Sequence, residues 1–361
     1  METDNLEDLS QRTVNDAVSE RYAEGANAVV PELCCPVSYD GRYLEILPEE
    51  IIDRDYGCGD PSQFVAEGET VLDLGSGGGK ICYMASQIVG PKGKVIGVDM
   101  TPDMLELSRK YQQQMADKIG WHNTTFFRGQ IENLKLDLDQ LDNWLGDNKV
   151  EGVESMQGMQ AEINRLEQES PMIADNSVDV VVSNCVLNLV APDLKQKLFE
   201  EIYRVLKPGG RAVISDIVSS ERVPEHLQKD SELWSGCISG AFEEVDFLNA
   251  FADVGFVGVK SEIRQSEAWQ VVEDIEFRSM TVIAYRPHEA PCCSAGGDVI
   301  YKGPFEAVSD ESGTIFARGE KVAVSASQLE TMSSSPYKQY FDCFDGKGEE
   351  IASQESQGGC C

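Results

Sequence analysis

Short apolar runs alternate with longer stretches of helical patterning through the middle of the chain. The run VDVVVSN at residues 178–184 is apolar at most positions, which is typical of a parallel strand buried on both faces of a sheet. Seven such runs, separated by helical segments, predict an α/β fold built on one doubly wound parallel sheet. The predicted strands lie near Val71–Leu74, Val95–Asp99, Thr125–Phe127, Val178–Ser183, Arg211–Asp216, Val257–Glu262 and Ser279–Tyr285.

The segments outside this alternation predict further parts. In residues 132–171, apolar residues such as Leu134, Leu138 and Leu141 recur at helical spacing, which predicts amphipathic helices in an insertion lying on the sheet. After residue 287, the turn-like residues 310–313 separate two apolar stretches and predict a β-hairpin. The expected parts are an N-terminal cap at 1–62, a sheet domain at 63–287 with the insertion 132–171 and a loop at 219–243, a small β-containing C-terminal domain at 288–332, and a mobile Ser-, Gly- and Gln-rich tail at 333–361.

Charge narrows the range of partners. The 361 residues include 63 acidic and 30 basic ones, which gives a formal net charge of -33 at pH 7. Such an excess repels phosphate backbones and anionic lipid, so neither nucleic acid nor a membrane is expected as a partner. The sequence has no apolar stretch of about 20 residues, and its polar, acidic start is unlike an export signal, which predicts a cytoplasmic protein.

Eleven cysteines stand in this long chain, and without an export signal they are expected to be reduced, functional thiols. Cys185 directly follows the strand at 178–184, at the sheet edge where α/β proteins bind ligands. Cys58 and Cys237 lie in glycine-containing loops, where apolar packing is not expected, whereas Cys82 lies in a predicted helix and is interpreted as a core residue. Six further cysteines form the adjacent pairs Cys34 with Cys35, Cys292 with Cys293, and Cys360 with Cys361.

The segment VLDLGSGGGK at 71–80 predicts a site for a nucleotide-like cofactor. An apolar strand runs into a glycine-rich loop, which lets the backbone approach a ligand closely, and then into the N-terminus of a helix. Asp99 ends the next strand, 24 residues after Gly75, where a carboxylate can accept hydrogen bonds from ribose hydroxyls. Dinucleotide-binding proteins share this arrangement, so these features alone leave the cofactor class open.

The order of residues in the loop narrows that choice. An acid, Asp73, precedes the first glycine, and KPGG at 207–210 leads into another strand, and both features resemble the S-adenosylmethionine-dependent methyltransferases. The resemblance implies a seven-stranded sheet whose last strand is antiparallel. The S-adenosylmethionine-binding residues that it implies are Asp73, Gly75, Ser76, Gly77, Gly79, Asp99, Met100, Gln130, Ile131, Glu132 and Asn184.

Three cysteine-containing segments narrow the family further. The arsenic(III) methyltransferase family is resembled by three segments: YGCG at 56–59, SNCVLNL at 183–189 and ELWSGCISGA at 232–241. The resemblance implies that the loop at 219–243 of this chain is the acceptor loop. The resemblance implies that trivalent arsenic is the substrate, delivered as a thiol conjugate, and that no structural metal is needed. The residues that it implies as arsenic ligands are Cys58, Cys185 and Cys237.

The same resemblance implies further catalytic roles. Tyr56 is expected beside the sulfonium methyl group of the cofactor, and Cys34 and Cys35 occupy the place of an upstream thiol that takes part in redox steps. A thiol reductant such as thioredoxin or glutathione is implied as a partner. The chemistry is consistent with this set, since thiolates are soft ligands and three of them can hold arsenic while its lone pair stays available to attack a methyl group.

Two other functions remain open on the sequence. A related methyltransferase acting on carbon or on another soft element would keep the glycine loop and Asp99 but would not need all three cysteines. A non-enzymatic metalloid-binding protein would need the cysteines but not a complete cofactor site. The sequence contains both features, which favours arsenite methylation.

Overall fold

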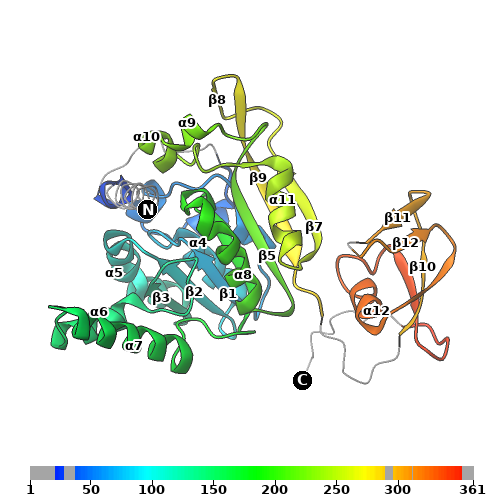
Figure 1. The fold of residues 1–361 in the computed structure, drawn as a ribbon, viewed down its shortest axis with the longest axis horizontal. Helices are drawn as coiled ribbons and strands as arrows, with labels where there is room; N and C mark the ends of the chain where they lie inside the picture. Colours follow the sequence, from blue (N-terminus) through cyan, green and yellow to red (C-terminus); the bar gives the residue numbers. More distant parts are fainter. Residues whose placement is uncertain (1–20, 28–36, 289–295, 311, 352–361) are drawn as a thin grey trace.

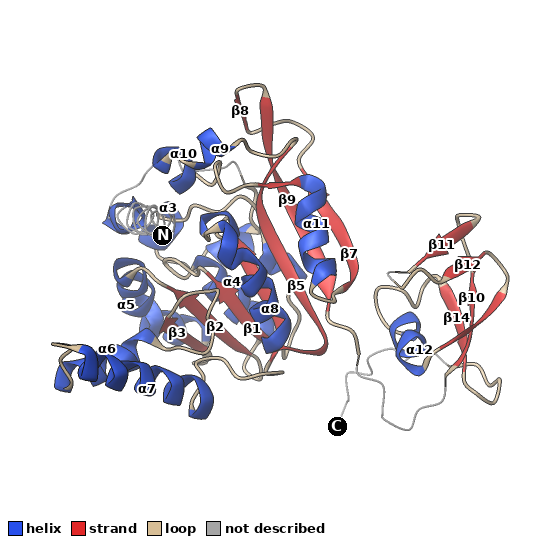
Figure 2. Ribbon diagram, in the orientation of Figure 1, coloured by secondary structure: helices blue, strands red, loops and turns tan. Residues whose placement is uncertain are grey.

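The computed structural model describes residues 21–27, 37–288, 296–310 and 312–351, and a twisted mixed sheet lies at its centre (Figures 1 and 2). The long strands have the spatial order β3-β2-β1-β4-β5-β9-β7. All seven predicted strands are present, which confirms the fold class. Their bounds are β1 (Thr70–Leu74), β2 (Lys94–Asp99), β3 (Thr124–Arg128), β4 (Val178–Asn184), β5 (Leu206–Ser219), β7 (Val257–Arg264) and β9 (Ile275–Tyr285).

Strand direction also follows the prediction. β1 to β5 pair in parallel, and the last strand, β9, lies antiparallel between β5 and β7. Two short strands that the apolar pattern did not predict extend the sheet: β6 (Phe242–Glu243) pairs with β5, and β8 (Gln270–Val272) pairs with β9. Each is too short to give an alternating pattern in the sequence.

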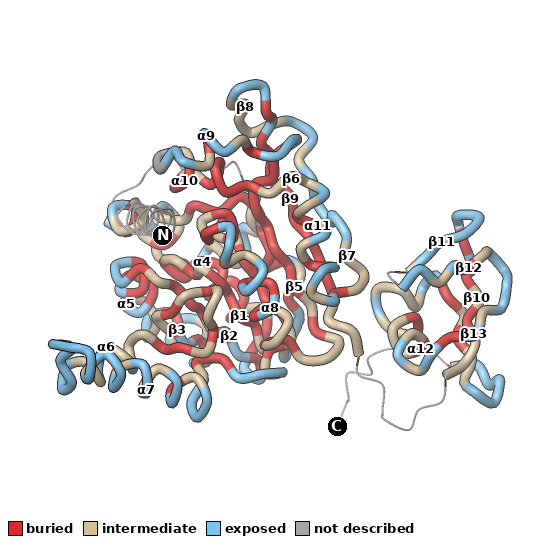
Figure 3. Tube along the Cα trace, in the orientation of Figure 1, coloured by how far each residue is buried: buried red, intermediate tan, exposed pale blue. Residues whose placement is uncertain are grey.

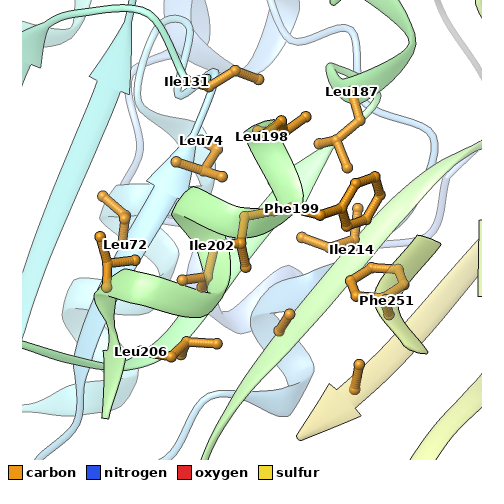
Figure 4. Packing of buried hydrophobic residues seen from close by; sticks show 14 of the residues in the cluster. Leu72, Leu74, Ile131, Leu187, Leu198, Phe199, Ile202, Leu206, Ile214 and Phe251 are labelled. Carbon is orange, nitrogen blue, oxygen red and sulfur yellow. The ribbon is translucent and has the colours of Figure 1, made fainter. Parts of the chain in front are cut away.

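Helices cover both faces of the sheet, because neighbouring strand residues point to opposite sides. Val71 belongs to a cluster under α4 (Lys80–Val89) and α5 (Pro102–Ile119), while Leu72 belongs to a cluster under α8 (Lys195–Val205) and α11 (Glu244–Asp253). Figure 4 shows the second cluster, in which side chains of α8 and α11 pack against β1 and β5. Figure 3 shows that the buried residues follow the strands.

The insertion forms two helices, as predicted, but its position differs from the prediction. α6 (Leu138–Asp147) and α7 (Val153–Glu169) lie beside β3 at the edge of the sheet and not on its face (Figure 1). The whole of α6 is described and contains no buried residue, and in α7 only Leu166 is buried. The apolar positions of α6 and α7 are too sparse to cover a sheet face. The segment before α6 is anchored by Leu134, which is buried in the core of the sheet domain outside any helix, and ion pairs such as Arg109–Asp139 add contacts at the surface.

The N-terminal cap and the acceptor loop meet above the carboxyl ends of the strands. The cap contains α2 (Gly41–Leu44), α3 (Glu49–Asp53) and the 3-10 helix η2 (Pro61–Phe64), together with a helical segment at 21–27. The acceptor loop contains α9 (Glu225–Gln228) and α10 (Ser231–Ser235). None of the helices in the described ranges is long and apolar enough to span a bilayer.

The C-terminal part is a separate small β unit with its own core. β10 (Gly297–Tyr301), β13 (Lys321–Val324) and β14 (Phe341–Phe344) form its sheet, and α12 (Ala326–Ser333) packs on them. The predicted hairpin is confirmed, since β11 (Ala307–Ser309) and β12 (Ile315–Ala317) pair across the turn at Asp310.

The prediction of a mobile tail from residue 333 is wrong over the described part of that segment. β14 pairs with β10 at the centre of the small sheet, and Phe341 and Cys343 are buried in its core. Composition suggested disorder, but side chains at alternating positions of β14 point to the same face and pack into the core of the unit. The unit therefore continues at least to residue 351.

Phe251 provides a test of the core. It is fully buried, and its ring lies 4.8 Å from the ring of Phe199. Phe251→Ala should lower the free energy of unfolding by about 3–5 kcal/mol, because it removes apolar contacts and leaves a cavity. Val153→Ala, at a position that is 74% exposed, is the control and should change it by less than about 0.5 kcal/mol. Denaturant unfolding measures both, and equal effects would contradict the packing described here.

Candidate active site

A cavity lies beyond the carboxyl ends of β1, β2 and β4, where parallel strands bring successive loops together. β1 leads into Gly75, β2 ends at Asp99, and β4 leads into Cys185. Ten of the eleven predicted cofactor residues line this cavity: Asp73, Gly75, Ser76, Gly77, Asp99, Met100, Gln130, Ile131, Glu132 and Asn184. Gly79 is the exception, because it caps α4 in a left-handed conformation.

The glycine loop leaves room for a ligand. Gly77 has φ +49°, and a Cβ there would meet nothing closer than the Met104 sulfur at 3.9 Å. By contrast, a Cβ on Gly75 would lie 2.5 Å from Val186, so that glycine is needed for packing. The Ser76 hydroxyl is buried and has no hydrogen-bond partner among the residues that the structure describes. An open backbone and an unsatisfied buried hydroxyl fit a polar cofactor such as S-adenosylmethionine.

Asp99 shapes the glycine loop as well as the cavity wall. Its Oδ2 accepts a hydrogen bond from the Gly77 backbone N–H at 2.8 Å, and its Oδ1 accepts one from Thr101 N–H at 2.8 Å. Burial raises the pKa of Asp99, while the backbone donors, led by Thr101, oppose that shift. Its role at the cofactor ribose stays a prediction.

Asp73 lies deeper, at the base of the cavity. Its Oδ2 accepts a hydrogen bond from the Cys82 thiol at 3.2 Å. Burial raises the pKa of Asp73 to about 8, the Cys82 thiol opposes that shift, and the nearby carboxyls of Asp55 and Asp99 add to it. Cys82 is fully buried in the core, as predicted, and it also partners Asp73.

Asn184 ends β4 and connects the cavity to the first cysteine loop. Its Oδ1 accepts hydrogen bonds from the backbone N–H groups of Cys58 at 2.8 Å and Gly59 at 3.0 Å, and its Nδ2 donates to Gly59 O at 2.8 Å. A Cβ on Gly57 would lie 2.0 Å from the Asn184 amide nitrogen, so the loop approaches this side chain as closely as glycine permits.

The three predicted arsenic ligands meet in one buried cluster, but two of them are joined. Cys58 and Cys185 form a disulfide, whereas three reduced thiols were predicted. Cys237 keeps its thiol, which donates to Cys185 O at 3.3 Å. The loops around Cys58 and Cys237 were expected to lack apolar packing, yet both residues are buried among Ile217, Phe277 and other apolar side chains. Their glycines make the tight packing possible.

Four residues near the cysteines were not predicted from the sequence. A carboxylate oxygen of the fully buried Asp216 lies within 4.8 Å of both disulfide sulfurs. Burial raises the pKa of Asp216 to about 6. Asn188 and Lys195 both lie close to Asp216. The Tyr22 hydroxyl lies 4.0 Å from the Cys237 sulfur. An apolar strand ending in SD was the only signal for Asp216.

Two tyrosines line the cavity on the side of the N-terminal cap. Tyr56 is buried, lines the cavity, and donates through its hydroxyl to Gly25 O at 3.0 Å. Its ring packs edge-on against Tyr22, which also lines the cavity, with 6.2 Å between the ring centroids. The role of Tyr56 beside the cofactor methyl group stays a prediction. Outside the described residues lie Cys34, Cys35, Cys292, Cys293, Cys360 and Cys361.

Family comparisons divide the chain in the same way as the fold. Residues 66–171 and 151–270 match a family described as a methyltransferase domain. Residues 288–361 match a domain of unknown function (DUF8838). The second match coincides with the separate β unit and includes the segment predicted to be a mobile tail.

Known proteins resemble most of the chain. It is 31% identical over 322 residues to an arsenite methyltransferase of Mus musculus, covering 86% of this chain and 76% of that protein. It is 42% identical over 211 residues to an arsenite methyltransferase of Halobacterium salinarum, covering 58% of this chain and 43% of that protein. The crystal structure of an arsenic(III) S-adenosylmethionine methyltransferase from Chlamydomonas reinhardtii superposes with a TM-score of 0.57 at 27% identity, over 88% of this chain and 99% of that one.

Asp99→Ala should weaken S-adenosylmethionine binding roughly ten- to hundredfold, because hydrogen bonds to a charged group contribute about 1.5–3 kcal/mol. The loss includes the contact that holds Gly77 in the loop. Asp103→Ala, on the exposed side of the first turn of α5, is the control and should bind normally. Calorimetric titration compares the variants, and an unchanged dissociation constant for Asp99→Ala would place the ribose elsewhere.

Asp73 should make the stability of the ligand-free protein depend on pH. Its pKa of about 8 in the folded protein exceeds the value of about 4 in an unfolded chain, so the folded state binds more protons between these values and stability falls as pH rises through them. Asp73→Asn should flatten this fall above about pH 6, while the raised pKa of Asp216 leaves a slope of the same sign below it. Denaturant unfolding across this pH range tests the difference, and parallel curves for both proteins would contradict it.

Proposed function

Because the chain belongs to the arsenite methyltransferase family, we propose that it transfers methyl groups from S-adenosylmethionine to trivalent arsenic held by the thiols of Cys58, Cys185 and Cys237. One observation carries the proposal. Cys185 borders the cofactor cavity on one side, and on the other it contacts both remaining cysteines. A substrate held by these sulfurs would lie next to the cofactor.

Arsenic binding requires the disulfide to open first. The Cys58–Cys185 bond takes up two electrons and two protons, which a thiol reductant such as glutathione or reduced thioredoxin supplies while it is oxidised to a disulfide. Arsenous acid then exchanges its three hydroxyl groups for three thiolates. Each thiol proton leaves with one hydroxyl group, and three water molecules are released.

The cofactor-binding residues orient the methyl donor relative to the arsenic that accepts the methyl group. When bound, S-adenosylmethionine supplies an electrophilic methyl group on a positively charged sulfonium. Asp99 holds the glycine loop open through Gly77, and Asn184 fixes the Cys58 loop beside the cavity. Soft thiolate ligands leave the arsenic lone pair available as the nucleophile, so the protein's task is alignment and not proton transfer.

The surroundings of the site favour this reaction. Tyr22 and Tyr56 line the cap side of the cavity and pack edge-on against each other. The carboxyl groups of Asp73 and Asp99 line the cavity and that of Asp216 lies beside the disulfide, and a bound sulfonium cation would favour their charged forms. A cavity lined by ten of the residues predicted to bind S-adenosylmethionine favours this function over that of a metalloid-binding protein without catalysis.

Repeated methylation needs a further redox step. Transfer of a methyl cation leaves arsenic formally pentavalent, and two electrons from a pair of thiols return it to the trivalent state as a disulfide forms. We assign this role to Cys34 or Cys35, whose positions in the sequence match the upstream thiol of the family.

Replacing any one of Cys58, Cys185 and Cys237 by serine should lower the rate of arsenite methylation by roughly tenfold or more, because a hard hydroxyl is a poor ligand for arsenic. Cys82→Ser is the matched control, since its hydroxyl can still donate to Asp73 and the residue lies on the buried face of α4. Its methylation rate should stay close to that of the native protein.

The assay uses labelled S-adenosylmethionine, arsenite and a thiol reductant, and cofactor affinity is measured in parallel. Native rates in all three acceptor variants would rule out the trithiolate site. Loss of methylation together with unchanged cofactor affinity would support it.

A further inference from the structure

Two of the three cysteines proposed to bind arsenic, both near Asn188, have an unusual backbone conformation. Cys185 has φ +61° and Cys237 has φ +62°, in the left-handed region that side chains other than glycine rarely adopt. Such conformations persist only when surrounding contacts fix them, and they gather at functional sites. The question is which contacts hold these two residues in place.

Asn188 makes contacts at this junction from a fully buried position. Its Nδ2 donates to Ile217 O at 2.6 Å and to Cys237 O at 3.3 Å. Its backbone N–H donates to Asp216 Oδ2 at 3.2 Å. One side chain in the 3-10 helix η3 (Leu187–Leu189), which follows Cys185, thus ties β5 and the acceptor loop together.

The fit around Asn188 is close on the acceptor-loop side as well. A Cβ on Gly240 would lie 1.9 Å from the Asn188 carbonyl oxygen, so only glycine lets the loop approach this far. The Lys195 ammonium donates to Gly240 O and lies over the Phe242 ring, which fixes the far end of the same loop. Trp234 adds a hydrogen bond from its indole N–H to Leu189 O at 3.2 Å, and its carbonyl accepts one from Cys237 N–H at 3.0 Å.

The Asn188 side chain is retained at a cost. Its Oδ1 is buried and has no hydrogen-bond partner in the described part of the chain. An unsatisfied buried acceptor destabilises the folded state, and an apolar side chain of the same shape would avoid this penalty. The two donated hydrogen bonds, and the geometry that they impose on Cys237, are what the amide provides.

We propose that Asn188 is a positioning residue that sets the separation of Cys185 and Cys237, so that both thiols reach one trivalent arsenic atom. This inference rests on the proposed function for its substrate. The disulfide shows that Cys58 and Cys185 adjoin without help from Asn188, since no hydrogen bond from its side chain reaches the Cys58 loop among the described residues. Asn188 therefore acts on the third ligand, Cys237.

Two kinds of arsenical differ in whether they need the third thiol ligand. Arsenite uses three thiols, whereas phenylarsine oxide is satisfied by two adjacent thiols, which Cys58 and Cys185 provide after reduction. Asn188→Leu keeps the shape of the side chain and removes its donors. It should lower arsenite affinity about tenfold or more, because the third thiol no longer adds its intramolecular contribution. Phenylarsine oxide and S-adenosylmethionine should bind nearly as before.

Two further variants provide a second test and a control. Gly240→Ala should give the same selective loss, because its Cβ pushes the acceptor loop away from the Asn188 carbonyl. Asn123→Leu removes a comparable amide, which donates to Gly90 O and accepts from Ser86, far from the cysteines. It should leave both arsenicals unaffected. Equal losses for arsenite and phenylarsine oxide in Asn188→Leu, or no loss in either, would overturn the assignment.

A cross-linking measurement decides the positioning role without arsenic. Dibromobimane bridges two thiols a few ångströms apart, and peptide mapping of the reduced protein gives the yield of the Cys185–Cys237 bridge. This yield should fall in Asn188→Leu and Gly240→Ala but not in Asn123→Leu, and an unchanged yield would overturn the inference. If the native protein bridges normally yet binds no arsenite, the proposed function fails while the positioning role stands.

Discussion

The arrangement of this site depends on the hydrogen bonds that the side chain of Asn184 makes to the Cys58 loop. Asn184 ends β4, and its amide binds the backbone of the Cys58 loop on both sides of the cysteine. This places a residue of the N-terminal cap against Cys185, which is 127 positions away in sequence. Gly57 and Gly59 permit the approach, since a Cβ on Gly59 would lie 2.5 Å from the Ser215 hydroxyl on β5. This contact therefore holds Cys58 beside Cys185, which lines the cavity.

The site combines an acidic cofactor cavity with an apolar sulfur cluster. Asp73 and Asp99 lie at the strand ends facing the cavity, while Cys58, Cys185 and Cys237 are packed among aliphatic and aromatic side chains. Carboxyl groups suit a cationic sulfonium cofactor, and a cluster with little water suits thiolate ligands of a soft element. Asp216 lies beside the disulfide sulfurs and holds the turn after Cys185 through the N–H of Asn188. The two environments meet at Cys185, which lines the cavity and belongs to the cluster.

The C-terminal unit contributes no residue to this site among those described. It has its own core, and it contacts the methyltransferase domain where the Tyr337 hydroxyl accepts a hydrogen bond from Gly258 N–H on β7 at 2.7 Å. A Cβ on Gly258 would lie 3.0 Å from Pro336, so the contact is a close one. β7 is the edge strand farthest from the glycine loop in the order of the sheet.

The sequence by itself determined the sheet, the glycine loop and the identity of the cysteines. Mainly apolar runs such as Val178–Ser183 indicate strands that are buried on both faces of the sheet. The acid before Gly75 indicates a local turn, whose conformation the neighbouring residues determine. Tertiary structure alone decided the rest. The Cys58–Cys185 pairing, the buried carboxyl of Asp216 and the amide of Asn188 depend on contacts between segments far apart in the chain, and no local pattern encodes them. The same reason explains the error at β14, where pairing with β10 gives order to a segment whose composition resembles a tail.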